Sequence, residues 1–138
     1  MHFEYIIESG NFSRAGYASS EIKKVLKQLN VDLSIIKRTV VASYEAEVNI
    51  VAHALGGTIY VDIDTEKILI RLVDQGPGIP DIEKAMQEGF STASSQVREM
   101  GFGAGMGLPN IKKNADLLNI ESIVGKGTNL EITLFLNH

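Results

Sequence analysis

Two stretches in the first half of the chain carry apolar residues at the spacing of an α-helix. The first runs from Ser13 to Leu29, and its apolar positions are Ile22, Val25, Leu26 and Leu29. Asn30 can end this helix, and Asp32 can cap a second one that continues to about Leu55. The apolar set of the second helix is Ile36, Val40, Tyr44, Val48, Val51 and Leu55, and Gly56 and Gly57 stop it.

Five other stretches have short runs of β-branched, aromatic or alternating apolar residues, which predict strands. They are residues 3–9, 58–64, 67–73, 119–124 and 129–136. A tight turn at Thr65–Glu66 joins the second stretch to the third, and the sequence GKGT (125–128) joins the last two. Both pairs are therefore expected to form antiparallel hairpins.

The chain between these hairpins is less regular. The sequence DQGPGIPD (74–81) is too rich in glycine and proline for a regular element, and residues 81–89 predict a short helix. Residues 90–105 have many small side chains and no clear periodicity, which predicts a long loop or lid. A helix is then expected from Met106 to Leu118, because Leu108, Ile111, Ala115 and Leu118 are helically spaced.

This order of elements predicts an α+β fold. A mixed, mostly antiparallel sheet would carry the helices on one face. The length of 138 residues suits one domain over 1–138, and no internal repeat or linker is visible.

Composition narrows the function. The chain is 44% hydrophobic and 22% charged, as in ordinary globular proteins, and contains no cysteine, which fits a reducing cytoplasm. No apolar run is long enough for a membrane span. The net charge of −4 argues against nucleic acid as a partner, but an anion held by backbone amides stays compatible with it.

Three polar residues recur every four positions on the second predicted helix: Glu45, Asn49 and His53. They share one stripe of the helix, because four residues make slightly more than one turn. A carboxylate one turn from a carboxamide can activate a hydroxyl and hold a hard cation through oxygen. The alternative is an ordinary solvated helix face.

Asp74 ends a strand, and Gly76 and Gly78 follow it. A carboxylate fixed there can accept a hydrogen bond from the amino group of a base, and small residues let a flat ring approach the backbone. The alternative is an aspartate that only closes a turn. The later stretch GFGAGMGL (101–108) places glycines directly before a helix start, where free N–H groups can meet phosphates. A flexible linker is the alternative, and Thr128 taken alone is a hairpin residue.

Four blocks in order, EAEVNIVAHA, DQGPGIP, GFGAGMGL and GKGT, resemble the N, G1, G2 and terminal boxes of the ATPase fold shared by gyrase, Hsp90, histidine kinases and MutL. Within that superfamily the chain is similar to the small serine kinases of bacterial partner-switching systems, which include anti-sigma factors. The run DQGPGIPDIEKAMQEGFST is most similar to the switch kinase that phosphorylates STAS-domain proteins of the stressosome, whereas the helix ending EAEVNIVAHA resembles the anti-sigma kinases equally well.

The resemblance implies a role for each matching residue. Glu45 would be the general base for a serine hydroxyl or water, and Asn49 would coordinate Mg²⁺. Asp74 would accept the adenine amino group. The other ATP-binding positions implied are His53, as a supporting or phosphate contact or a purely structural residue, Gly76 and Gly78 beside the base, Gly101, Gly103, Gly105, Met106, Gly107 and Leu108 at the phosphates, and Thr128 on the adenine side.

The resemblance also implies cofactors and partners. ATP and Mg²⁺ are the expected cofactors, and a STAS-domain protein or a sigma factor is the expected partner. A homodimer is compatible with it, since relatives often dimerise through the sheet or the first helix. GFGAGMGL contains no lysine or arginine to neutralise a transferring phosphoryl group. Two functions therefore stay open: a serine/threonine protein kinase, and a nucleotide-dependent regulator that sequesters its target with weak or no kinase activity.

Overall fold

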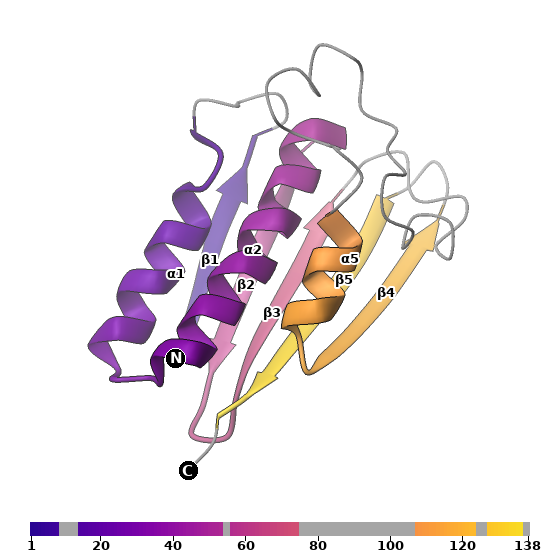
Figure 1. Cartoon of the computed structure of the whole chain (residues 1–138). Coiled ribbons are helices and arrows are strands. Elements are labelled where there is room, and N and C mark those ends of the chain that lie inside the picture. Colours follow the sequence, from indigo (N-terminus) through magenta and orange to yellow (C-terminus); the bar gives the residue numbers. More distant parts are fainter. Residues whose placement is uncertain (9–13, 54–55, 75–106, 124–126, 137–138) are drawn as a thin grey trace.

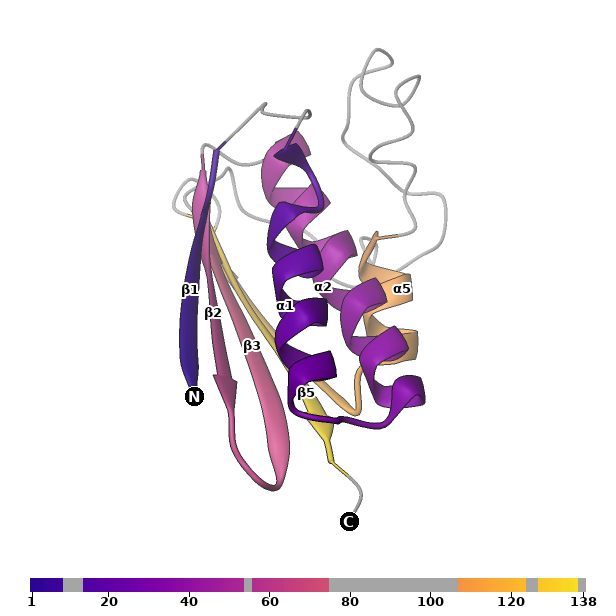
Figure 2. The ribbon, with the colours of Figure 1, turned by 90° about the vertical axis from the view of Figure 1, so that its left-hand side faces the viewer.

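The computed structural model describes residues 1–8, 14–53, 56–74, 107–123 and 127–136. Within these ranges one five-stranded sheet carries its helices on a single face (Figure 1, Figure 2). The elements, labelled as in Figure 1, are β1 His2–Ile7, α1 Tyr17–Gln28, α2 Leu33–His53, β2 Gly57–Ile63, β3 Lys67–Asp74, α5 Gly107–Asn114, β4 Leu117–Ile123 and β5 Gly127–Phe135. The predicted α+β class is confirmed.

The strand order in the sheet is β1-β2-β3-β5-β4. Each of the four pairings between the described strands is antiparallel, and both predicted hairpins are present as β2–β3 and β4–β5. The β2–β3 turn is closed by Asp64, whose Oδ1 accepts hydrogen bonds from the backbone N–H of Glu66 at 2.7 Å and of Lys67 at 2.9 Å.

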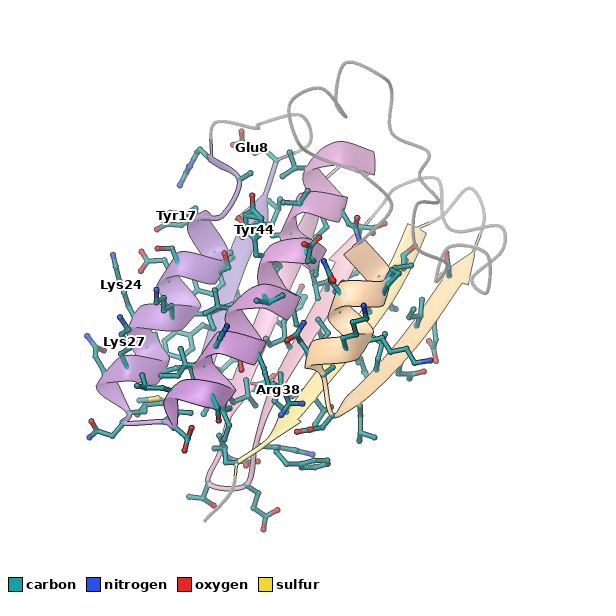
Figure 3. All side chains as sticks on the ribbon, in the orientation of Figure 1. Glu8, Tyr17, Lys24, Lys27, Arg38 and Tyr44 are labelled. Atoms are coloured by element: carbon teal, nitrogen blue, oxygen red, sulfur yellow. The ribbon has the colours of Figure 1, made fainter. Side chains whose placement is uncertain are left out.

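The core lies between the sheet and the helices, because alternate residues of each strand face the helical layer. Its strand residues include Ile59, Val61, Ile68, Ile70, Leu72, Leu130, Ile132 and Leu134, and its helical residues include Ile22, Leu26, Ile35, Ile36, Ile50 and Ile111. Each such side chain contributes about 1.5–3 kcal/mol on burial. Lys24 and Lys27 mark the opposite, solvent-facing side of α1 (Figure 3).

Helix α1 begins at Tyr17, four residues later than the apolar spacing predicts. Gly16 precedes it with a φ of 97°, a left-handed conformation that favours glycine. At the other end Asn30 has a φ of 56°, its N–H bonds to the carbonyl of Lys27, and the N–H of Val31 bonds to that of Leu26. This pair of bonds is a Schellman motif with asparagine in the left-handed position, so the predicted end at Asn30 is confirmed.

Helix α2 lies between α1 and α5 and packs against both (Figure 1). Asp32 caps it as predicted, since its Oδ1 accepts from the N–H of Ser34 at 2.8 Å. The apolar stripe predicted for this helix is wrong at Tyr44, which is 38% exposed, with its ring above Gly16. The predicted end at Leu55 lies outside the described residues.

Helix α5 is shorter than predicted, because it ends at Asn114 and Leu118 lies in β4. Leu118 pairs with Ile132, and the N–H of Asp116 bonds to the carbonyl of Thr133 at 2.9 Å. Leu118, Ile120 and Ser122 are the partly buried positions of the strand. Pairing with β5 therefore overrides the helical spacing of Leu118. The predicted helix over 81–89 and the lid over 90–105 lie outside the described residues.

Candidate functional site

One end of the molecule collects the residues predicted to carry the chemistry. Helix α2 and strand β3 end there, and β2, β5 and α5 begin there (Figure 1). The predicted residues Glu45 and Asn49 lie in the second half of α2, Asp74 is the last residue of β3, and Thr128 is the second residue of β5.

Glu45 and Asn49 lie one helical turn apart and are both partly exposed. Within the part of the chain that the structure describes, Asn49 has no hydrogen-bond partner for its side-chain amide. Glu45 accepts a single hydrogen bond there, from Nδ2 of Asn110 to its Oε1 at 3.3 Å. The two side chains thus keep polar atoms available for a ligand.

Asn110 was not among the residues that the sequence singled out. It is the fourth residue of α5, the helix that follows the glycine-rich stretch, and it is partly buried against α2. Helix α5 also carries Pro109, which costs no hydrogen bond in the first turn of a helix. The contact joins positions 65 residues apart. The sequence carries only one hint of it: a polar residue one turn into a helix that starts beside the predicted phosphate site.

Asp74 and Thr128 meet at the second part of the site. Oδ1 of Asp74 accepts a hydrogen bond from the backbone N–H of Thr128 at 3.0 Å. The hydroxyl of Thr128 lies 3.0 Å from that of Ser122 on β4. The Asp74 carboxylate is therefore oriented by the strand that pairs beside it, and the Thr128 hydroxyl is held by the hairpin.

Gly57 is a further residue that the sequence marks only as a helix stop. It pairs with Asp74 across the β2–β3 ladder. A Cβ at this position would lie 2.8 Å from the carbonyl oxygen of Val73 and 3.2 Å from both Cα and Cβ of Asp74. Glycine at position 57 therefore lets β2 approach the Val73–Asp74 backbone closely, which a residue with a Cβ could not do without a shift of Asp74.

The remaining predicted residues contribute less to the described geometry. Gly107 opens α5, and Leu108, 9% exposed, belongs to the core. His53 is the last residue of α2, and its side chain lies outside what the structure describes. Also outside the described residues are Gly76, Gly78, Gly101, Gly103, Gly105 and Met106.

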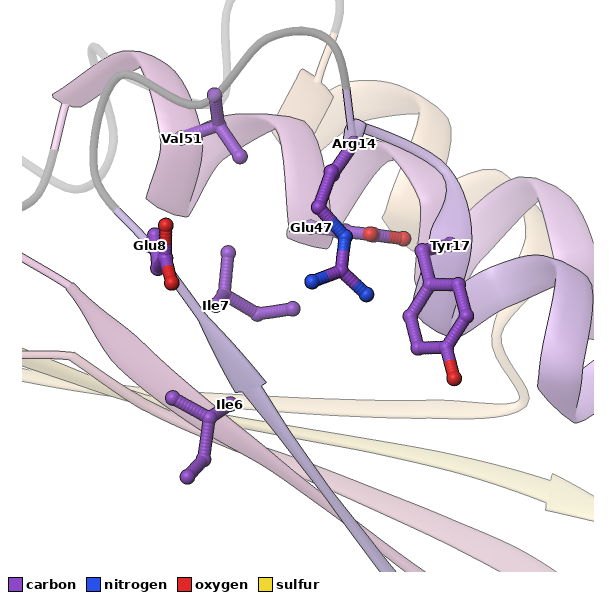
Figure 4. Close-up of a pocket in the computed structure, with 7 residues that line it drawn as sticks. All are labelled: Ile6, Ile7, Glu8, Arg14, Tyr17, Glu47 and Val51. Atoms are coloured by element: carbon purple, nitrogen blue, oxygen red, sulfur yellow. The ribbon is translucent and has the colours of Figure 1, made fainter.

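A shallow pocket between the end of β1 and the start of α1 is lined by none of the predicted residues (Figure 4). It is lined by the apolar residues Ile6, Ile7 and Val51, by the aromatic residue Tyr17, and by the charged residues Glu8, Arg14 and Glu47. Its Arg14 guanidinium lies 4.7 Å from the centroid of the Tyr17 ring, a cation–π distance. The pocket is lined by residues of β1, of α2 and of the start of α1, whereas Asn110 reaches Glu45 from α5.

The donor set suits a magnesium ion shared with phosphates better than a metal held by protein alone. Among the described residues, no three His, Cys, Asp or Glu side chains gather in one place. Mg²⁺ in nucleotide sites usually takes one or two protein oxygens and completes its shell with phosphates and water. The partly exposed amide of Asn49, which has no hydrogen-bond partner among the described residues, fits that requirement.

Comparison with known proteins decides the family. Residues 41–138 match the family model described as histidine kinase-, DNA gyrase B- and HSP90-like ATPase. The chain belongs to this ATPase family. Membership implies that it binds ATP. None of the described helices is both long and apolar enough to cross a bilayer.

Sequence relatives narrow the group within the family. The chain is 34% identical to the serine/threonine-protein kinase RsbT of Bacillus subtilis over 83% of both chains. It is 33% identical to the anti-sigma F factor of Caldanaerobacter subterraneus, with 99% of this chain and 93% of the relative covered. The chain is thus a member of the small anti-sigma factor and switch-kinase group.

Solved structures share the fold at lower identity. The RsbU and RsbW domains of Rv1364c from Mycobacterium tuberculosis superpose with a TM-score of 0.68 at 15% identity, covering 100% of this chain and 33% of that one. The mycobacterial sensor histidine kinase MprB superposes with a TM-score of 0.56 at 19% identity, covering 99% of both chains. These two likenesses support the architecture of sheet and helices.

Proposed function

We propose that this protein is a Mg-ATP-dependent serine/threonine kinase that regulates a partner-switching pathway by phosphorylating a STAS-domain protein in the cytoplasm. The observation that supports it most is the pair on α2: a partly exposed Glu45 carboxylate lies one turn from the amide of Asn49, which has no partner in the part of the chain that the structure describes. The 34% identity to a protein named serine/threonine kinase points the same way.

In this proposal Glu45 is the general base. Its carboxylate takes the proton of the substrate hydroxyl as the hydroxyl oxygen bonds to the γ-phosphorus, the bond to the β-phosphate oxygen breaks, and ADP leaves. Asn49 would hold Mg²⁺ through its side-chain oxygen, and the bound ion would supply charge neutralisation for the phosphates.

The nucleotide base and the phosphates would be held by the other elements at this end of the sheet. Asp74, oriented by the N–H of Thr128 and closely approached by Gly57, accepts the adenine amino group. Gly76 and Gly78 pass beside the base. The amides of the glycine-rich stretch and the start of α5 face the phosphates, with His53 as a supporting contact.

The experiment that tests this function is transfer of labelled phosphate from ATP to a co-purified or co-encoded STAS-domain protein. Glu45→Ala should lower the rate by roughly 10²–10⁴-fold, the usual contribution of a general base. Glu121→Ala is the matched control, because Glu121 is an exposed glutamate on β4, where its change should leave transfer intact. Transfer by Glu45→Ala at the wild-type rate would remove Glu45 from the mechanism.

A second function is favoured by the relatives that carry the name anti-sigma F factor. In that case the protein sequesters a sigma factor or another target in a nucleotide-dependent manner, with weak or no phosphoryl transfer. A pull-down with ATP, with ADP and without nucleotide separates the two. Capture of a sigma factor only with nucleotide, and no phosphorylated product, would favour sequestration, whereas partner binding that ignores nucleotide would count against it.

A further inference from the structure

The contact between Asn110 and Glu45 links helix α2, which carries the proposed base, to helix α5, which follows the glycine-rich stretch. Oε1 of Glu45 accepts from Nδ2 of Asn110 at 3.3 Å, and this is the one hydrogen bond of Glu45 among the described residues. A glutamate side chain on a helix surface has several staggered rotamers. A donor on one oxygen selects among them and leaves the second oxygen for a substrate hydroxyl.

Asn110 is also placed at the start of α5, which follows the glycine-rich stretch directly. As the fourth residue of the helix it directly follows the first turn, where the N–H groups of Gly107 and Leu108 lack partners within the helix. Its own carbonyl accepts a bond from Nδ2 of Asn114 at 2.8 Å. Phosphates that bind at this end of α5 would therefore lie next to Asn110, the residue whose side chain reaches Glu45.

The far end of α5 is fixed independently. Asp116, two residues after α5, accepts a hydrogen bond from Arg38 of α2 at 2.8 Å and another from the backbone N–H of Phe135 at 2.7 Å. A shift of the start of α5, where Asn110 lies, would therefore change its distance to Glu45 while the C-terminal end stays in place.

We infer that Asn110 is a positioning residue for Glu45: its side-chain amide orients the carboxylate and ties that orientation to the phosphate end of α5. The inference rests on the proposed role of Glu45 as base. The 3.3 Å separation is longer than the common 2.7–3.2 Å, which leaves the bond room to shorten when nucleotide binds. Catalytic hydrogen bonds are often long in ligand-free proteins and tighten in the reacting complex.

The first test needs no kinase activity. Side-chain amide signals of the full chain, labelled with ¹⁵N, are recorded with and without Mg-ATP, and the Asn110 pair is assigned by its loss in Asn110→Ala. Glu45→Ala should shift the Asn110 signals by several linewidths and abolish their response to Mg-ATP. The Asn114 signals, one turn further on, should stay in place upon Glu45→Ala. Asn110 signals that ignore Glu45→Ala would overturn the inference whatever the activity.

The second test uses transfer from ATP to the STAS-domain protein. Asn110→Ala should lower kcat by about 10- to 100-fold, as loss of an orienting partner commonly does, with the KM for ATP unchanged within about twofold. Asn110→Gln keeps an amide donor and should recover part of kcat, whereas Asn114→Ala should match wild type. Thermal unfolding of each variant separates a folding defect from a catalytic one.

The two tests separate the two claims. If wild type transfers no phosphate while the Asn110 amide still reports both Glu45 and Mg-ATP, the kinase proposal fails and the positioning of Glu45 stands. The opposite result is that wild type transfers phosphate and both variants fold as wild type does. If Asn110→Ala then keeps the wild-type kcat, or if Asn110→Gln has no higher kcat than Asn110→Ala, the inference is wrong and the kinase proposal stands.

Discussion

Glu47 is a buried carboxylate that caps a helix other than its own. It lies on α2 with 1% of its surface exposed. Its Oε2 accepts from the N–H groups of Gly16 at 3.0 Å and Ala18 at 3.1 Å, and its Oε1 accepts from the N–H of Ser19 at 3.1 Å. Gly16, the residue before α1, has no side chain to do this. Glu47 therefore satisfies three N–H groups at the helix end where negative charge is favoured.

Glu47→Ala should strongly destabilise the fold. The change leaves the N–H groups of Ala18 and Ser19 buried without an acceptor, while that of Gly16 is only partly buried. Each buried orphan costs about 1–3 kcal/mol, so the two together should cost about 2–6 kcal/mol, and the partly buried N–H of Gly16 adds a smaller amount. A domain of this size is stable by about 5–15 kcal/mol, so much of the total would be lost.

Urea unfolding followed by circular dichroism measures the loss, with the slope of the transition checked for each variant. Glu47→Gln keeps one acceptor oxygen and the volume, and should lose less than Glu47→Ala. Glu121→Ala, an exposed glutamate, serves as the control and should stay within about 0.5 kcal/mol of wild type. A Glu47→Ala loss below about 1 kcal/mol would refute the reasoning that these three bonds hold α1 to α2.

Three further changes test other parts of the structure. Gly57→Ala should lower the free energy of unfolding by about 1–3 kcal/mol, because its Cβ would lie 2.8 Å from the Val73 carbonyl. It should also weaken ATP binding measured by calorimetry. Wild-type values for both quantities would contradict the close approach. Asp74→Asn should weaken ATP by about tenfold or more, since a carboxylate acceptor becomes partly a donor, and an unchanged Kd would exclude the adenine role of Asp74. The hydrogen bonds from Arg38 and then from the Phe135 N–H lower the pKa of Asp116 in the folded state. Its stabilising contribution is therefore complete above the unfolded pKa of about 3.9 and is lost as the pH falls through the lower folded pKa. Urea midpoints measured at falling pH below about 4 should decline less steeply in Asp116→Asn, and equal slopes would argue against this role.

Local patterns predicted the elements whose causes are local. The sequence predicted the cap by Asp32, the turn after Asp64 and the helix end at Asn30, because each depends on residues only a few positions away. Alternation of apolar residues likewise predicted both hairpins. The end of α5 could not be predicted in this way. Leu118 fits the spacing of a helix, and only its pairing with Ile132 of β5 places it in a strand.

The site shows the same division. Glu45, Asn49 and Asp74 were singled out from short motifs, and their roles remain a prediction. Asn110 and Gly57 could not be found in this way, since their meaning depends on a neighbour across a helix pair or a strand pair. Tyr44 fits the apolar spacing of α2, yet it is 38% exposed, and spacing alone does not distinguish such a position from a buried one.

The position of β5 in the sheet constrains how the protein folds. This strand is the last described along the chain, but it inserts between β3 and β4, and among the described strands β4 pairs with β5 alone. Asp74 and Thr128 are separated by 54 residues, so their bond requires closing a long loop, whose entropic cost slows folding. During synthesis the bond between Asp74 and Thr128 can therefore form only after β5 has emerged from the ribosome. A chain stalled before residue 127 would lack β5, and with it the strand that pairs with both β3 and β4 and the N–H that orients Asp74.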